Sequence, residues 1–200
     1  MKELATEFKF IPAFDWLKKL YPAICLLLIA ISAAGCSSSK KSAERNEDQT
    51  ESEVSEVQEY YTILEVAESE QLNPMYEKEA DTTLLYWLGD LPLELSGYTK
   101  CNVFALNVLK LSGFMTPSEN CTTAELFDTL LYSDILPVVS ANGFGNARPG
   151  DLIVWHGHVI IFEKHMNLNG TDYAVGWWAG TRQEDNGDNI INNVCHGKYK

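Results

Sequence analysis

The spacing of hydrophobic and polar residues changes along the chain. Between about residues 54 and 132, apolar positions recur three and four residues apart, which is the spacing of amphipathic helices. After about residue 151 they form short apolar runs separated by turns that contain glycine or asparagine, which is typical of strands. Helices followed by such strands predict the α+β class, with helices packed on a small antiparallel sheet.

Four helices are predicted in the first of these regions. They cover residues 54–73, 80–88, 101–112 and 122–132. Gly89 and Gly113 end the second and third helices, because glycine favours the left-handed conformation that follows a helix. Thr122 and Glu125 form a capping-box pattern at the start of the fourth.

Three strands are predicted in the second region. They are Asp151–Trp155, His158–Phe162 and Tyr173–Trp178. His156 and Gly157 join the first two, and an Asn169-Gly170 turn precedes the third. The middle run is apolar on both faces, so we expect it to be a central strand.

The helix that begins at residue 101 carries a cysteine in its first turn. On a helical wheel its apolar residues fall within about a quarter turn of Cys101, and Lys110 lies opposite. These apolar residues are Phe104, Ala105, Val108, Leu109 and Leu111. Cys101 is therefore predicted on the inward face, where free backbone N–H groups and the helix dipole favour a thiolate.

His158 is the second residue predicted to carry chemistry, because it opens the central strand directly after Gly157. An imidazole placed there against Cys101 would act as base toward the thiol and then as acid toward a leaving amine. The N–H groups at the helix start would hold the oxyanion of a tetrahedral intermediate. The alternatives are a buried or disulfide-bonded cysteine and a strand-end histidine.

The first 35 residues are predicted to be a lipoprotein signal peptide. Lys18 and Lys19 precede an apolar run, residues 23–34, that is short for a membrane span. The following Ala33-Ala34-Gly35-Cys36 resembles a bacterial lipobox, so Cys36 is predicted to carry the lipid. An uncleaved anchor helix is the alternative. Both place the chain in the bacterial cell envelope, attached to the membrane on the periplasmic or extracellular side.

Residues 36–55 contain almost no apolar side chains and are rich in Ser, Glu and Lys. They are predicted to form an acidic disordered tether, and residues 56–200 to form one domain. The net charge is −13; residues 1–35 carry four lysines and three acids, so the remainder carries −14. This charge argues against nucleic acid as a partner, since phosphate binding needs a basic surface.

The chain has five cysteines, of which Cys25 and Cys36 belong to the predicted signal peptide and lipid site. Cys101, Cys121 and Cys195 remain. An odd number outside the cytoplasm leaves at least one thiol unpaired within the chain. A Cys121–Cys195 bridge with Cys101 free is the first arrangement to test.

Three short motifs, taken in order, resemble the core of NlpC-type and CHAP-type peptidoglycan hydrolases. They are Lys100-Cys101-Asn102 with the helix that follows, Arg148–Trp155 (RPGDLIVW) and Gly157–Phe162 (GHVIIF). The resemblance covers residues 98–180 and implies a papain-like fold in which Cys101 is the nucleophile and His158 the general base. It implies hydrolysis of an amide in the peptide part of peptidoglycan through an acyl-enzyme, without a cofactor or metal.

Two features depart from that family pattern. Lys-Cys-Asn at residues 100–102 stands where NlpC-type enzymes usually have Asp-Cys-Ser. The family also places a polar residue on the strand after the histidine to hold the imidazole, and residues 173–180 offer none that fits. Asp185 or Asn186, in the loop after residue 181, is the predicted third member. A catalytically inactive lipoprotein that binds wall peptide or a partner is the alternative function.

Three aromatic residues are candidates for substrate contact. Tyr98 precedes the predicted nucleophile and would line the cleft or donate to the oxyanion. Trp155 and Trp178 would stack on substrate, with core packing as the alternative for both. His156 and His158 lack acidic or thiol partners at metal-ligand spacing, so no metal site is predicted.

Overall fold

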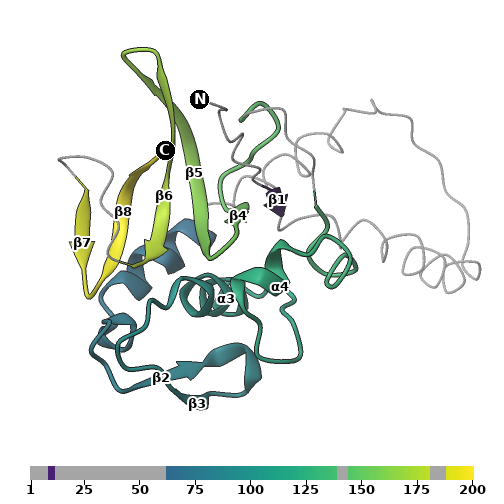
Figure 1. Cartoon of the computed structure of the whole chain (residues 1–200), viewed down its shortest axis with the longest axis vertical. Helices are drawn as coiled ribbons and strands as arrows, with labels where there is room; N and C mark the ends of the chain where they lie inside the picture. The colour runs from purple at the N-terminus through teal and green to yellow at the C-terminus, as the bar shows by residue number, and fades with distance from the viewer. Residues whose placement is uncertain (1–8, 12–61, 139–143, 181–187) are drawn as a thin grey trace, which may run out of the picture. The chain divides into compact units, whose positions relative to one another are not determined.

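An antiparallel sheet of six strands, in the order β1-β4-β5-β6-β8-β7, forms the framework of the protein (Figure 1). This computed structural model describes residues 9–11, 62–138, 144–180 and 188–200. The strands are β1 (Lys9–Ile11), β4 (Leu152–Trp155), β5 (His158–Leu168), β6 (Thr171–Ala179), β7 (Asn189–Ile191) and β8 (Val194–Tyr199). A separate hairpin pairs β2 (Thr82–Leu85) with β3 (Leu91–Glu94).

The helices of the described residues pack on one face of the sheet (Figure 1). They are a helix at residues 62–71, the 3-10 helices η1 (Pro74–Tyr76) and η2 (Tyr86–Leu88), α3 (Cys101–Leu111) and α4 (Thr123–Phe127). α3 contacts β5 and β6, and α4 contacts β4. Helices packed on antiparallel strands confirm the predicted α+β class.

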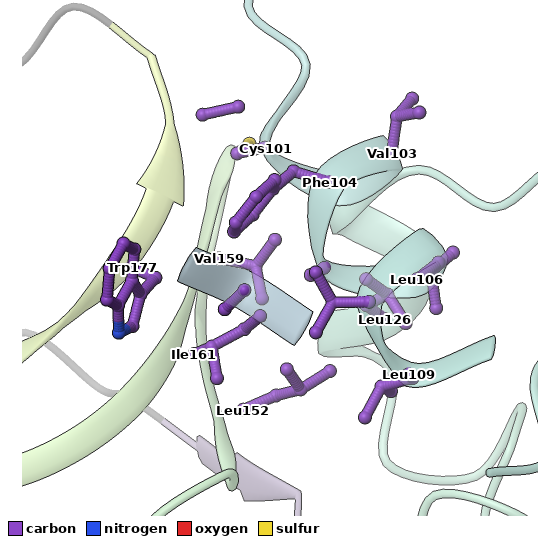
Figure 2. Packing of buried hydrophobic residues seen from close by; sticks show 14 of the residues in the cluster. Cys101, Val103, Phe104, Leu106, Leu109, Leu126, Leu152, Val159, Ile161 and Trp177 are labelled. Carbon is purple, nitrogen blue, oxygen red and sulfur yellow. The ribbon is translucent and has the colours of Figure 1, made fainter. Parts of the chain in front are cut away.

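Alternation along the central strands divides the buried side chains into two clusters, one on each face. The helix-side cluster joins α3 to Leu152, Val154, Val159, Ile161 and Trp177 of the sheet (Figure 2). The far-side cluster contains Ile153, Ile160, Phe162, Ala174, Trp178, Cys195 and Tyr199. β5 is buried on both faces, which confirms that it is a central strand.

The helix predicted from residue 101 is confirmed, with Cys101 buried in its first turn and Lys110 exposed. Gly113 has a φ of +84°, and the N–H of Phe114 donates to the carbonyl of Leu109 over 3.0 Å. The left-handed glycine therefore ends the helix as predicted. The helix expected over residues 54–73 is confirmed for residues 62–71, and its first part lies outside the described residues.

The helix predicted over residues 80–88 is wrong, because this segment forms β2 followed by η2. Gly89 and Asp90 both have positive φ, +70° and +61°, and reverse the chain between β2 and β3. The ladder then pairs Leu85 with Leu91. The β-branched residues Thr82 and Thr83 favour this extended conformation over a helix.

The fourth predicted helix is shorter than expected. The capping box between Thr122 and Glu125 is present, as predicted, but α4 ends at Phe127 instead of residue 132. The Asp128 carboxylate accepts the N–H of Leu130 over 2.9 Å. This local bond offers the backbone an alternative to the next helical turn.

Besides β2 and β3, three further strands of the described residues were not predicted. β7 and β8 are joined by Asn192 and Asn193, which both have positive φ (+50° and +59°), as Asn169 does before β6. β1 pairs with β4, although its residues fall within the segment predicted to be a signal peptide. The rest of that segment, Cys36 and the predicted tether lie outside the described residues.

Asn107 connects α3 to the β2–β3 hairpin through a buried polar network. Its Oδ1 accepts the N–H of Tyr86 over 2.8 Å, and its Nδ2 donates to the carbonyl of Leu84 over 2.9 Å. The same amide donates to the hydroxyl of Tyr76 over 3.0 Å. One side chain therefore satisfies backbone groups that the hairpin would otherwise bury without partners.

Replacing Asn107 with alanine should lower the free energy of unfolding by about 2–4 kcal/mol, because it leaves a buried N–H and a buried carbonyl unpaired. Urea unfolding followed by circular dichroism measures this change. Lys110→Ala, on the exposed face of the same helix, is the matched control and should change stability by less than about 0.5 kcal/mol. An Asn107→Ala protein as stable as the control would contradict the proposed role of the network.

Candidate functional site

The N-terminus of α3 places Cys101 against the sheet. Only 3% of the residue is exposed, and it belongs to the helix-side cluster. Figure 2 shows it at the helix start, near Phe104 and close to the strand that carries Val159. The apolar face of α3 is what turns Cys101 inward, as its helical spacing predicts.

Burial and backbone donors act in opposite directions on the Cys101 thiol. Burial raises its pKa, while the backbone N–H groups of Val159, Asn102 and Cys101 itself hydrogen-bond to the sulfur and lower it. Burial is the larger effect, so the pKa of the thiol lies above its ordinary value. A base is therefore needed to make the thiolate at neutral pH.

His158 lies among aromatic side chains of the far-side cluster. Its ring stacks on that of Tyr199 with centroids 5.0 Å apart, and the Trp155 and Trp178 rings follow at 6.2 and 6.4 Å. The ladder pairs His158 with Trp155, two residues along from the Ile153–Ile160 pair. This register gives His158 the face of β5 that points away from α3.

The thiol therefore meets the backbone of β5 and not the imidazole. The hydrogen bonds described for Cys101 come from backbone N–H groups, and none involves the ring of His158. Side chains at adjacent positions of a strand leave on opposite faces, so the register gives the side chains of His158 and Val159 different faces of β5. The dyad of Cys101 and His158 stays a prediction. The two residues are nevertheless neighbours through Val159, which follows His158 and donates to the sulfur.

The other predicted site residues have different surroundings. Tyr98 is 68% exposed, on the segment that leads into α3. Trp178 is fully buried, so it packs in the core and offers no surface to a ligand. Trp155 is half-buried at the end of β4. Asp185 and Asn186, the predicted third members, lie outside the described residues.

The Cys121–Cys195 bridge, the first arrangement to test, is not formed: Cys101, Cys121 and Cys195 are all free thiols. Cys121 belongs to the helix-side cluster and Cys195 to the far-side cluster. A disulfide needs Cβ atoms about 4 Å apart, which two faces of one sheet do not provide. Burial raises the pKa of Cys121 to about 11 and, together with Asp188, that of Cys195 to about 12.

An ion pair that no motif predicted joins β5 to β8. Nε2 of His196 lies 2.5 Å from Oε2 of Glu163, and the imidazole stacks on Trp177 with centroids 4.0 Å apart. The register of β5 shifts between Phe162 and Lys164, so Glu163 sits in a bulge. A bulge turns a side chain out of the regular alternation. The sequence signal was the sudden change from an apolar run to Glu-Lys.

Comparisons of this chain with family models, with curated proteins and with solved structures found no match. The resemblance to NlpC-type and CHAP-type hydrolases therefore stays a prediction. Within the described residues, no three or more His, Cys, Asp and Glu side chains form a group suited to a metal ion. The same residues contain no helix of the length and apolar character that crossing a membrane requires.

The raised pKa of Cys101 predicts slow alkylation in the resting protein. At pH 7 the thiolate fraction is smaller than that of an exposed cysteine, so iodoacetamide should label Cys101 at least about tenfold more slowly than free cysteine. The rate should continue to rise above pH 9, because the thiol ionises only there. Peptide mass spectrometry resolves the sites, and Cys121 and Cys195 serve as slower internal references. Rapid labelling of Cys101 near pH 6 would contradict this expectation.

The lowered pKa of Glu163 predicts that the protein loses stability in acid. Burial raises its pKa, but hydrogen bonds from Lys164 and His196 outweigh burial and leave the pKa below its ordinary value. The carboxylate therefore stabilises the fold above about pH 4.5, and this contribution is lost as the pH falls through the lowered pKa. Glu163→Gln should be less stable than the wild type at pH 6, with the difference shrinking below pH 4. Urea unfolding at each pH measures the difference in the free energy of unfolding. Glu65→Gln, at an exposed helix position, is the control. A difference that does not change with pH would exclude the ionised pair as its cause.

Proposed function

We propose that this chain is a papain-like cysteine hydrolase that cleaves an amide in the peptide part of peptidoglycan. The observation that supports the proposal is the position of Cys101, which is buried in the first turn of α3 and shares a cluster with Val159 of β5, whose backbone N–H lowers the pKa of the thiol. The Cα atom of His158 is two bonds from that nitrogen. Because the Cα–Cβ bond of His158 points to the far face, a change in the backbone at this strand end, after Gly157, would bring the imidazole to the thiol.

The proposed reaction uses the thiol and the imidazole in turn. The imidazole takes the proton of the Cys101 thiol, and the thiolate forms a C–S bond to the amide carbon. The C–N bond breaks as the imidazolium returns that proton to the leaving amine. Water, deprotonated by the imidazole, then cleaves the thioester to release a carboxylic acid, and the thiol is restored.

The backbone at the start of α3 supports this reaction. The N–H groups of Cys101 and Asn102 point to the sulfur. Donors at this position also face the carbonyl oxygen of a group bonded to that sulfur, where negative charge develops. The helix dipole favours the same charge.

The location of the enzyme is part of the proposal. A lipid on Cys36, removal of residues 1–35 and an acidic tether at residues 36–55 would hold the domain in the bacterial cell envelope, within reach of the wall. The net charge of −13 supports a partner other than nucleic acid.

A non-catalytic protein that binds wall peptide with the same domain is the second candidate. The contacts of His158 with Tyr199 and Trp155, on the face away from α3, are the observation that favours it. Such a protein would bind purified wall without releasing products, and binding would not need the Cys101 thiol.

Digestion of purified sacculi should separate the two candidates. The wild-type protein should release fragments that carry new amino and carboxyl termini, which mass spectrometry detects. Cys101→Ala should reduce this release at least about 10³-fold, because it removes the nucleophile.

Cys121→Ala is the matched control, because it also removes a buried thiol and should keep its activity. If the wild type and Cys101→Ala release the same products, or if neither releases any, the hydrolase proposal fails. Retention of inactive protein on the sacculi would then support the binding function. A product in which the acyl group is joined to an added amine would instead identify an acyltransferase.

A further inference from the structure

Lys100, the residue before the cysteine, is completely buried. It is the N-cap residue of α3, and its carbonyl accepts the N–H of Phe104 over 2.9 Å, the first hydrogen bond of the helix. Its side chain forms no cap. The ammonium group is therefore buried for a reason other than helix capping.

The buried ammonium is held by three backbone carbonyls. Nζ donates to the carbonyl oxygens of Met75, Glu77 and Ala80 over 2.9, 2.9 and 2.8 Å. A lysine ammonium has three N–H donors, so all of them are satisfied. The accepting carbonyls belong to η1 and the turn after it, 20 to 25 residues earlier in the chain. Lys100 thus fixes this segment to the start of α3.

Burial lowers the pKa of Lys100, and the carboxylates of Asp81, Glu77 and Glu79 oppose that effect. The charge matters because a neutral amine has only two N–H donors and would leave one of the three carbonyls without a donor. Hydrogen bonds from a charged donor are also stronger than neutral ones.

Asn102 forms a second connection on the other side of the cysteine. Its Nδ2 donates to the carbonyl of Cys121 over 2.7 Å. Cys101 therefore lies between two side chains that each hold a distant segment against the first turn of α3. The departure from the Asp-Cys-Ser pattern has a physical explanation here, since aspartate cannot donate to three carbonyls.

We propose that Lys100 is a positioning residue that holds the Cys101 sulfur against the Val159 N–H by fixing the η1 segment to the first turn of α3. This inference deepens the proposed hydrolase function and rests on it for its catalytic consequence. Without the ammonium, the first turn opens locally, and the sulfur loses both its burial and its fixed position.

Site-resolved alkylation of the full chain tests this role. In Lys100→Ala, the rate of iodoacetamide labelling at Cys101 should rise by about tenfold or more, because the first turn opens without global unfolding. Labelling of Cys121 and Cys195 should stay within about twofold of the wild type, since their clusters remain closed. A purely structural role would instead raise all three rates together, through global unfolding.

Chemical rescue makes the test specific for the ammonium. Lys100→Ala removes three carbons and the nitrogen, so n-propylammonium fits the space that it leaves. This cation should return the Cys101 rate to within about twofold of the wild type, whereas 1-propanol and sodium chloride should not. Lys100→Met, which fills most of the space of the lysine chain but lacks the ammonium group, should show the raised rate without rescue. Lys110→Ala, on the exposed face of α3, is the matched control and should behave as the wild type.

Two outcomes would overturn the proposal. One is an unchanged Cys101 rate in folded Lys100→Ala or, if that variant does not fold, in Lys100→Met. The other is an equal acceleration at all three cysteines without rescue. Thiol labelling and rescue require no wall substrate. The positioning role of Lys100 can therefore fail while the sacculus assay succeeds, and it can hold while the sacculus assay fails.

Discussion

The fold depends on the burial of β5 on both of its faces. Val159 and Ile161 pack beneath α3, while Ile160 and Phe162 pack in the far-side cluster. Full burial of each large apolar side chain contributes about 1.5–3 kcal/mol. A shift of one residue in register would exchange the two clusters, so the register is strongly fixed. This constraint decides where every side chain near the Cys101 thiol points.

The β2–β3 hairpin is held to this core by a different kind of interaction. β3 is largely exposed, and the fully buried apolar residue of the hairpin is Leu85 of β2, in the helix-side cluster. Asn107 of α3 also binds backbone groups of residues 84 and 86 in the hairpin and in η2. Lys100, the N-cap residue of α3, binds backbone carbonyls of residues 75, 77 and 80, in the segment before the hairpin. Both side chains are completely buried. Because their partners are backbone groups, the contacts depend on the path of the chain more than on the identity of its side chains.

The sequence predicted the elements in which a local rule and burial agree. The helix from residue 101, the capping box at Thr122 and the Asn169-Gly170 turn follow from spacing and turn chemistry, and all are present. The helix predicted at residues 80–88 is wrong because the apolar residues there fit both helical and strand spacing. Pairing with β3 makes residues 82–85 a strand. The partners of Lys100 and the bulge at Glu163 could not be predicted, since both depend on contacts between segments far apart in the chain.

The same reasoning explains why Cys101 was placed correctly and the imidazole was not. Helical spacing fixes the direction of a side chain within one element, whereas a contact between α3 and β5 also needs the register of the sheet. In β5, residues 159–162 are locked by burial, whereas His158, before them at the strand end, is half-buried. Gly157 precedes it with a φ of +84°, so the strand constrains His158 from one side only. A histidine farther along β5 would be held on one face by burial on both sides, whereas at this strand end a backbone movement is what would bring the His158 imidazole to the other face, as the proposed reaction requires.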